Sequence, residues 1–504
     1  MSVRTHWASR TAFVLAAIGS AVGLGNLIRF PYICARYGGG AFLVAYVVAL
    51  LTAGIPIMIL EFGLGHISGG SAPKAFREVH PKLEWLGWIA AGVGFFITVY
   101  YNVILAWSFS YLWDAFSLPS WAPQAGAYFE HKLGIDVVKD PFTLTCVKWP
   151  LFVGLVLTWV AVVASVWKGA TTVSKVVYAT VLIPWVILLV FVVRAVTLPG
   201  ALDGLKVYLW PQWGSLLQPE VWLAAYTQVF FSLSIGFGIM IAYASFLPKK
   251  SDLVKNAVIV CVADTVTAFV AGLAVYGCLG YLSRESGKPI SELGASGLGL
   301  TFVTYPRLIA LLPFGHRLFG VLFYLMVITL GIDSAFSLLE SFASAVRDKW
   351  NMSHHKANVI VGVTGFLFSV PLVTGAGLYW IDTMDRFLTY FGLGIVGLME
   401  CLIVSDVFAC ERLRGHINEI SDMKISALWD VMIMAIAPAA MLFFLAAEVY
   451  QRIQTPYGGY PRKLEFLGGW LVLIVVLLMA RIFHALPWAP QKEPEIMAET
   501  FDEA

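Results

Sequence analysis

The stretch Gly19-Ser20-Ala21-Val22-Gly23-Leu24-Gly25-Asn26 interrupts an apolar run over residues 11–35, and Phe231-Ser232-Leu233-Ser234-Ile235-Gly236-Phe237-Gly238 interrupts another over residues 222–247. Each places an apolar–Gly–apolar–Gly unit inside a run that is long enough to cross a bilayer. Glycine weakens a helix by about 1 kcal/mol relative to alanine and permits positive φ angles. We therefore expect both runs to form helices that are broken near their centres.

A broken helix in a membrane carries a specific implication. Unwound backbone is tolerated there only where protein buries it or where it lines a cavity, and it frees carbonyls for cations and N–H groups for anions. The alternative is that these glycines only let helices pack closely. Two matching breaks at corresponding positions favour a fold of two repeats, each opened by a discontinuous helix.

The surrounding composition is that of a polytopic membrane protein. Of the 504 residues, 59% are hydrophobic and 13% are charged, whereas a soluble domain carries about 25% charged residues. No basic patch suited to nucleic acid is present, so we expect no nucleic-acid partner. Hydropathy predicts roughly twelve spans, near 11–35, 41–68, 87–117, 147–165, 173–197, 222–247, 254–282, 317–347, 356–376, 386–410, 426–450 and 464–487.

The short loops give the orientation. Lysine and arginine gather in the loops after the second, fourth, sixth, eighth and tenth spans, on the same side as Arg4 and Arg10. The positive-inside rule therefore places both termini in the cytoplasm. We expect the protein to lie in the plasma (inner) membrane. The residues before the first span are polar, so we expect this span to be retained rather than cleaved as a signal peptide.

Several stretches together resemble the neurotransmitter:sodium symporter family, from about Arg4 to about Glu448. They are Arg4 to Trp7, Ala21 to Pro31, Gly38-Gly39-Gly40-Ala41-Phe42, Gly54-Ile55-Pro56 with Glu61, and Leu198-Pro199-Gly200-Ala201. The resemblance implies an all-α integral membrane protein with the leucine-transporter fold: about twelve transmembrane helices, in two inverted five-helix repeats with discontinuous first and sixth helices. It divides the chain into a cytoplasmic gate segment 1–10, a first repeat 11–197, an extracellular loop 198–221, a second repeat 222–410, two accessory helices 411–487 and a cytoplasmic tail 488–504.

The resemblance also implies two sodium sites, a substrate pocket and two gates. The first sodium site takes Ala21, Asn26, Ser232 and Asp264, together with the substrate carboxylate. The second takes Gly19, Val22, Leu330, Asp333 and Ser334. The substrate pocket takes Ser20, Ala21, Gly23, Leu24, Gly25, Ile97, Tyr101, Phe231, Ser232, Ser234, Phe237, Ser334 and Leu338. Arg29 with Asp385 forms the outer gate, above Tyr101 and Phe237, and Arg4 and Trp7 with Asp348 form the cytoplasmic gate.

The chemistry of these residues suits sodium. Na⁺ is a hard cation that prefers oxygen ligands. Asp264 and Asp333 lie inside apolar runs, where an ionised aspartate costs about 2.5–3.5 kcal/mol unless it meets a cation or another partner. The alternative is an aspartate that is protonated or hydrogen bonded to a neighbouring helix. For four other buried acids, Glu61, Glu340, Glu400 and Glu448, we expect bracing roles.

We therefore expect sodium-coupled symport of a small neutral, hydrophobic L-amino acid by alternating access. Amine carriers of the family place an aspartate at the position of Gly23, whereas Gly23 leaves room for the carboxylate of the substrate. A betaine, taurine or another zwitterion is the alternative substrate. A sensor or an enzyme is disfavoured, because no P-loop, H-E-x-x-H or G-x-S-x-G motif occurs.

One position departs from the family pattern. Animal members place Asn at the position of Asp264 and Ser one turn later, and they need chloride; typical bacterial members place Glu one turn later. Here Asp264 is followed one turn later by Ala268. The negative charge has moved onto a sodium ligand, so we expect no chloride requirement, and proton uptake by Asp264 on the empty return step. The alternative is a permanently protonated Asp264 with chloride bound beside it.

Overall fold

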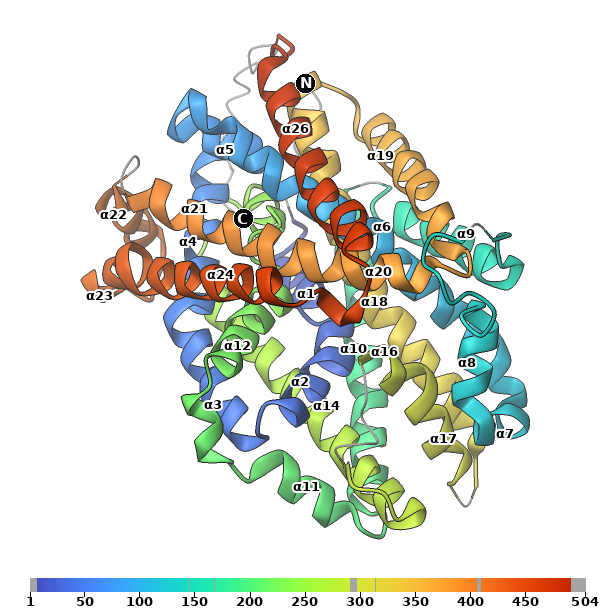
Figure 1. The fold of residues 1–504 in the computed structure, drawn as a ribbon. Coiled ribbons are helices and arrows are strands. Elements are labelled where there is room, and N and C mark those ends of the chain that lie inside the picture. The colour runs from blue at the N-terminus through green and yellow to red at the C-terminus, as the bar shows by residue number, and fades with distance from the viewer. Residues whose placement is uncertain are drawn as a thin grey trace, which may run out of the picture.

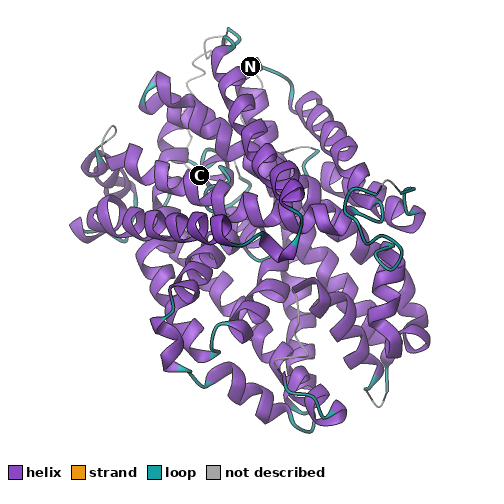
Figure 2. Cartoon of the chain, in the orientation of Figure 1, coloured by secondary structure: helices purple, strands orange, loops and turns teal. Residues whose placement is uncertain are grey.

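The computed structural model describes residues 7–490, except 144, 168, 291–296, 313 and 406–408. These residues form helices and connecting loops, without a strand (Figure 2). The helices of the first half are α1 (Arg10–Ala21), α2 (Phe30–Arg36), α3 (Gly40–Ala49), α4 (Ile55–Ser68), α5 (Ala72–Val79), α6 (Glu84–Asp114), α7 (Leu118–Trp121), α8 (Ala125–Leu133), α9 (Trp149–Ser165), α10 (Ala170–Val196) and α11 (Ala201–Leu209).

The second half continues in the same way after α11. Its helices are α12 (Pro219–Ser232), α13 (Ile239–Ala244), α14 (Leu253–Ser286), α16 (Gly297–Gly299), α17 (Tyr305–Ala310), α18 (His316–Trp350), α19 (His354–Ser369), α20 (Gly377–Phe387), α21 (Leu393–Ile403), α22 (Cys410–Ile420), α23 (Ala427–Val431), α24 (Ala437–Gln454), α25 (Arg462–Leu464) and α26 (Leu471–Ala485). Wide π-helical turns join some neighbours into continuous rods, as η2 (Leu50–Gly54) joins α3 to α4.

Many of these helices are fit to cross a bilayer. Nine helices of the described residues are long and apolar enough, and α1 and α2, bent by 45° at their break, make a tenth when they are counted as one span. The apolar helix α9 is shorter, and α12 and α13 are separated by non-helical residues. The described chain is thus a multi-pass helical membrane protein, because backbone in lipid must satisfy its hydrogen bonds within the segment.

Burial separates the inner helices from those that face lipid. The apolar window of α6 is 94% buried, whereas those of α24 and α26 are each 28% buried. The broken pair α1 and α2 lies at the centre of the molecule, and α24 and α26 lie on its outside (Figure 1). Any site formed at the breaks is therefore enclosed by protein.

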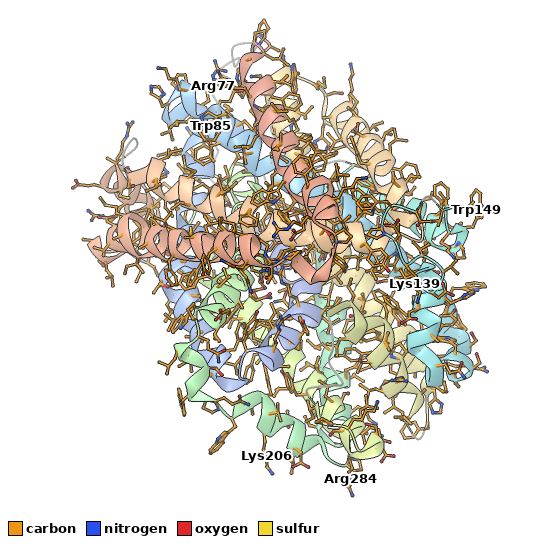
Figure 3. All side chains as sticks on the ribbon, viewed as in Figure 1. Arg77, Trp85, Lys139, Trp149, Lys206 and Arg284 are labelled. Carbon is orange, nitrogen blue, oxygen red and sulfur yellow. The ribbon has the colours of Figure 1, made fainter. Side chains whose placement is uncertain are left out.

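Loops that were expected on opposite sides of the membrane lie at opposite ends of the molecule. Figure 3 shows Arg77 and Trp85 at one end and Lys206 and Arg284 at the other. This agrees with placing the loop between the second and third spans on one side and the loop 198–221 on the other. Which end faces the cytoplasm stays a prediction.

Glycines set the closest helix contacts, as where α11 crosses α14. A Cβ atom added at Gly204 would lie 1.8 Å from the carbonyl oxygen of Tyr276. No rotamer change can relieve a clash between Cβ and backbone, so a larger residue here forces the two helices apart.

We predict that Gly204→Ala lowers the thermal stability of the protein in detergent. Alanine gains about 1 kcal/mol of helix propensity, but overpacking typically costs about 1–3 kcal/mol and here acts on rigid backbone. Gly214→Ala is the matched control, because a Cβ atom there meets nothing within 4 Å. A melting midpoint for Gly204→Ala at or above that of the control would contradict the packing.

Candidate functional site

Both predicted helix breaks are confirmed. At the first, α1 ends at Ala21 and Val22 turns to φ −80°, ψ 97°, before the wide turn η1 (Gly25–Arg29). At the second, Ser234, Gly236 and Gly238 adopt positive φ angles of 55°, 82° and 69° between α12 and α13. Left-handed backbone is strained for residues with a side chain, which explains why two of the three positions are glycine.

The two breaks face one small cavity of about 30 Å³. The residues that line it are all thirteen that were expected to line the substrate pocket. They are Ser20, Ala21, Gly23, Leu24, Gly25, Ile97, Tyr101, Phe231, Ser232, Ser234, Phe237, Ser334 and Leu338. Segments far apart in the sequence are thus brought together around enclosed space at the centre of the molecule.

Side chains satisfy the backbone groups that the first break frees. The N–H of Gly23 donates to Oδ1 of Asn26 at 3.0 Å, and the N–H of Leu24 donates to the hydroxyl of Tyr101 at 3.4 Å. The carbonyl of Ser20 accepts hydrogen bonds from the hydroxyls of two serines, Ser234 at 3.0 Å and Ser334 at 3.1 Å. One end of the cavity is therefore polar, with backbone donors and acceptors held by neighbouring helices.

The other end of the cavity is apolar. Ile97 and Leu338 come from α6 and α18, and the ring of Phe231, near the end of α12, lies 6.4 Å from that of Phe237, inside the second break. A ligand with a polar end and an apolar end matches this division.

Asp264 is fully buried on α14 and is surrounded by hydrogen-bond donors. Its carboxylate accepts from Nδ2 of Asn26 at 2.7 Å, from the hydroxyl of Ser232 at 2.9 Å to both oxygens, and from the hydroxyl of Tyr46 at 3.4 Å. The structure thus joins three of the residues expected at the first sodium site. Tyr46 was not predicted, because a tyrosine within an apolar run carries no signal of its partner.

Asp333 has fewer hydrogen-bond partners than Asp264. It is 1% exposed, and its Oδ1 has no hydrogen-bond partner. A Cβ atom at Gly19 would lie 2.7 Å from Oδ2 of Asp333, so the carboxylate lies directly against the end of α1. Val22 lies at the break itself and Leu330 one turn before Asp333 on α18. A buried carboxylate oxygen without a partner is a group that a hard cation would satisfy.

No group of three or more His, Cys, Asp or Glu side chains placed to hold a metal ion occurs among the residues described. The single carboxylates and hydroxyls present suit a hard monovalent cation instead.

Arg29 and Asp385, which were expected to pair as an outer gate, do not form an ion pair in this structure. The guanidinium of Arg29 lies 4.8 Å from the ring centroid of Phe231, and its Nη1 has no hydrogen-bond partner. Asp385 instead accepts from the hydroxyl of Tyr100 at 2.7 Å. Arg29 nevertheless lies next to the cavity, because Phe231, whose ring it contacts, also lines the cavity.

The structure describes two of the three residues that were expected at a cytoplasmic gate. Trp7 is buried, donates through Nε1 to the carbonyl of Tyr243 at 3.0 Å, and its ring packs against Phe246. Asp348 accepts from the backbone N–H of Ser71 at 2.8 Å. Arg4 lies outside the described residues.

Glu61 was expected only to brace the helices, and the structure gives it a specific hydrogen-bond partner. Its Oε1 accepts a 2.7 Å hydrogen bond from the N–H of Gly236, inside the second break. Two of the other buried acids, Glu340 and Glu448, pair with Arg347 and Arg386. Glu61 alone among these three holds unwound backbone, so α4 fixes the path of the chain between α12 and α13.

Comparisons with known proteins agree with this geometry. The model of the sodium:neurotransmitter symporter family matches residues 4–133 and 119–489. An uncharacterized sodium-dependent transporter of Methanocaldococcus jannaschii is 40% identical over 475 residues, covering 93% of this chain and 95% of the relative. The human sodium- and chloride-dependent GABA transporter 2 is 33% identical over 513 residues, covering 94% of this chain and 84% of the relative.

We predict that Glu61→Ala lowers thermal stability more than Glu61→Gln. Alanine leaves the buried N–H of Gly236 unpaired, at a cost of about 1–3 kcal/mol, whereas glutamine keeps an acceptor oxygen. Glu220→Ala, at an exposed position of α12, is the control for loss of a carboxylate. Equal melting midpoints for Glu61→Ala and Glu61→Gln would show that this hydrogen bond does not hold the segment.

Proposed function

Since the chain belongs to the sodium:neurotransmitter symporter family, we propose that it couples Na⁺ entry to uptake of a small neutral L-amino acid with a hydrophobic side chain. Members of this family are transporters, not enzymes. The observation that carries the proposal is the buried carboxylate of Asp333, which lies against the broken end of α1 with one oxygen unpaired.

The proposed architecture has twelve spans in two inverted five-helix repeats, 11–197 and 222–410, followed by two accessory helices within 411–487. The helix breaks at corresponding positions of the two proposed repeats support it. Segment 1–10 and tail 488–504 are cytoplasmic in this proposal, loop 198–221 is extracellular, and the protein lies in the plasma membrane. The lysines and arginines of the short loops support this orientation.

Two sodium ions are transported with the substrate in this proposal. The first is held by Asp264, Asn26, Ser232 and the carbonyl of Ala21, and the second by Asp333, Ser334 and the carbonyls of Gly19, Val22 and Leu330. Two Na⁺ ions balance two buried carboxylates, and the zwitterionic substrate adds no net charge. Sharing the substrate carboxylate with the first sodium ion links their binding free energies, so each raises the affinity for the other.

The substrate class follows from the two ends of the cavity. A Cβ atom at Gly23 would lie 2.4 Å from the hydroxyl oxygen of Ser334, so a side chain there would displace that hydroxyl, whereas glycine leaves room for the carboxylate of the substrate. Ile97, Phe231, Phe237 and Leu338 provide the apolar walls, worth about 0.8 kcal/mol per buried methylene. A betaine, taurine or another zwitterion is the second candidate; several relatives are named GABA transporters.

Access alternates between two closures. Arg29 and Asp385, with Tyr101 and Phe237 below them, close the outside, and Arg4 and Trp7 with Asp348 close the inside. The burial of Trp7 against Tyr243 and Phe246 supports a closed inner side in this conformation.

We also propose that transport needs no chloride. The hydroxyls of Tyr46 and Ser232 and the amide of Asn26 all donate to Asp264, so the anion that they solvate is the protein's own carboxylate. Relatives named chloride-dependent are 33% identical to this chain, and Ala268 offers no polar group one turn later. On the empty return step Asp264 loses its cation and takes up a proton.

The first test is uptake of radiolabelled neutral amino acids into proteoliposomes with an inward Na⁺ gradient. We predict that the wild type accumulates Leu, Met, Val or an aromatic amino acid, and that Asp333→Asn loses most uptake. Asn keeps the shape of the side chain but removes the charge that the second sodium ion needs. Asp203→Asn, exposed on α11, is the control; wild-type uptake by Asp333→Asn would refute the second sodium site.

The chloride proposal has a separate test, Na⁺-driven uptake with chloride replaced by gluconate. The wild type is predicted to be indifferent to the replacement, because Asp264 supplies the negative charge. Asp264→Asn is predicted to be impaired in gluconate. Loss of wild-type uptake without chloride would show that Asp264 does not supply that charge.

A further inference from the structure

A second and larger cavity opens on the outside of the molecule. It has a volume of about 830 Å³ and lies between α9, the first turns of α10, and α19; α9 and α19 run side by side here (Figure 1). Its lining residues are Val156, Trp159, Val160, Val163, Ala164, Trp167, Thr172, Lys175, Val359, Gly362, Val363 and Phe366. We call it the α9–α19 groove.

Two glycines of α19 shape the floor of the groove. A Cβ atom at Gly365 would lie 2.2 Å from the ring of Trp159, and one at Gly362 would lie 2.7 Å from Cγ2 of Val163. The indole N–H of Trp159 donates to the hydroxyl of Ser369 at 3.3 Å, which fixes the ring across the helix pair. The floor is thus a tight, ordered contact and not a loosely packed gap.

The walls of the groove are apolar and face the bilayer. Val160 is 62% exposed and Val363 is 53% exposed, although both lie on helices that cross or enter the membrane. In a bilayer these exposed apolar walls meet hydrocarbon rather than water, so a chain in the groove is held by van der Waals packing.

One end of the groove carries a positive charge. Lys175 is the single charged residue among the described lining residues. Trp167 lies near it in the loop between α9 and α10, is 43% exposed, and its ring lies 4.8 Å from that of His355 at the start of α19. Tryptophan at a helix end marks the level of the lipid headgroups, and basic groups between membrane helices attract anionic headgroups.

We propose that the α9–α19 groove binds one phospholipid with an anionic headgroup. An acyl chain lies along Val160, Val163 and Val363, and the phosphate lies against Lys175 and the indole of Trp167. The assignment requires only that the chain spans a membrane. It depends on neither the substrate nor the direction of transport.

The test uses the full-length protein in nanodiscs of phosphatidylcholine that contain graded fractions of phosphatidylglycerol. Native mass spectrometry after release counts the lipids that each protein molecule retains. We expect one retained phosphatidylglycerol per wild-type chain, and about fivefold weaker retention in Lys175→Gln, since a basic residue near a lipid surface contributes about 1 kcal/mol. Val160→Trp, which fills the groove from an exposed position, is expected to lose the retained lipid with Lys175 intact.

Lys250→Gln is the matched control, because Lys250 is an exposed lysine in the loop between α13 and α14, outside the groove. It is expected to retain phosphatidylglycerol as the wild type does. Equal retention by Lys175→Gln and Lys250→Gln would overturn the proposal, as would retention without headgroup preference. A wild-type dimer that Val160→Trp dissociates would also overturn it, because the groove would then be an interface between two copies of the chain.

Discussion

A bilayer core offers no hydrogen bonds to a broken helix, so every backbone group released at the two breaks must find its partner inside the protein. The centre of the molecule is organised by this constraint. Tyr101 of α6 receives the N–H of Leu24, Glu61 of α4 receives that of Gly236, and Ser341 of α18 donates to the carbonyl of Phe237 at 3.0 Å. These hydrogen bonds hold α4, α6 and α18 in fixed positions around the two breaks. The cavity lies in the space between the breaks and these helices.

The two buried aspartates solve the same problem of burial in different ways. Asp264 is surrounded by donors from three other helical elements, and its charge is solvated although no cationic side chain is bonded to it. Asp333 keeps an oxygen without any partner. Hydrogen bonds replace part of the solvation that Asp264 loses on burial, whereas the unpaired oxygen of Asp333 has no such replacement. The two proposed sodium sites are therefore chemically unequal.

Much of the centre was predictable because its residues are unusual for their surroundings. Glycine and serine within apolar runs indicated both breaks, and the residues that the family resemblance implied for the substrate pocket all line one cavity. Contacts decided by competition between side chains were not predictable. Arg29 and Asp385 were expected to pair, but in this conformation the ring of Phe231 takes the guanidinium and the hydroxyl of Tyr100 takes the carboxylate. Tyr46 was missed for a related reason, since only the folded arrangement of α3 against α14 gives its hydroxyl an acceptor.

The contact of Arg29 with Phe231, a residue of the cavity wall, depends little on pH and on salt concentration. A guanidinium keeps its charge at every physiological pH, and a phenyl ring has no proton to lose. Their attraction is short-ranged, between a charge and a quadrupole, so mobile ions screen it less than they screen two separated opposite charges. The contact between Arg29 and Phe231 therefore keeps its strength when the salt concentration or the pH of the surrounding medium changes. An exposed carboxylate–guanidinium pair would weaken under the same changes.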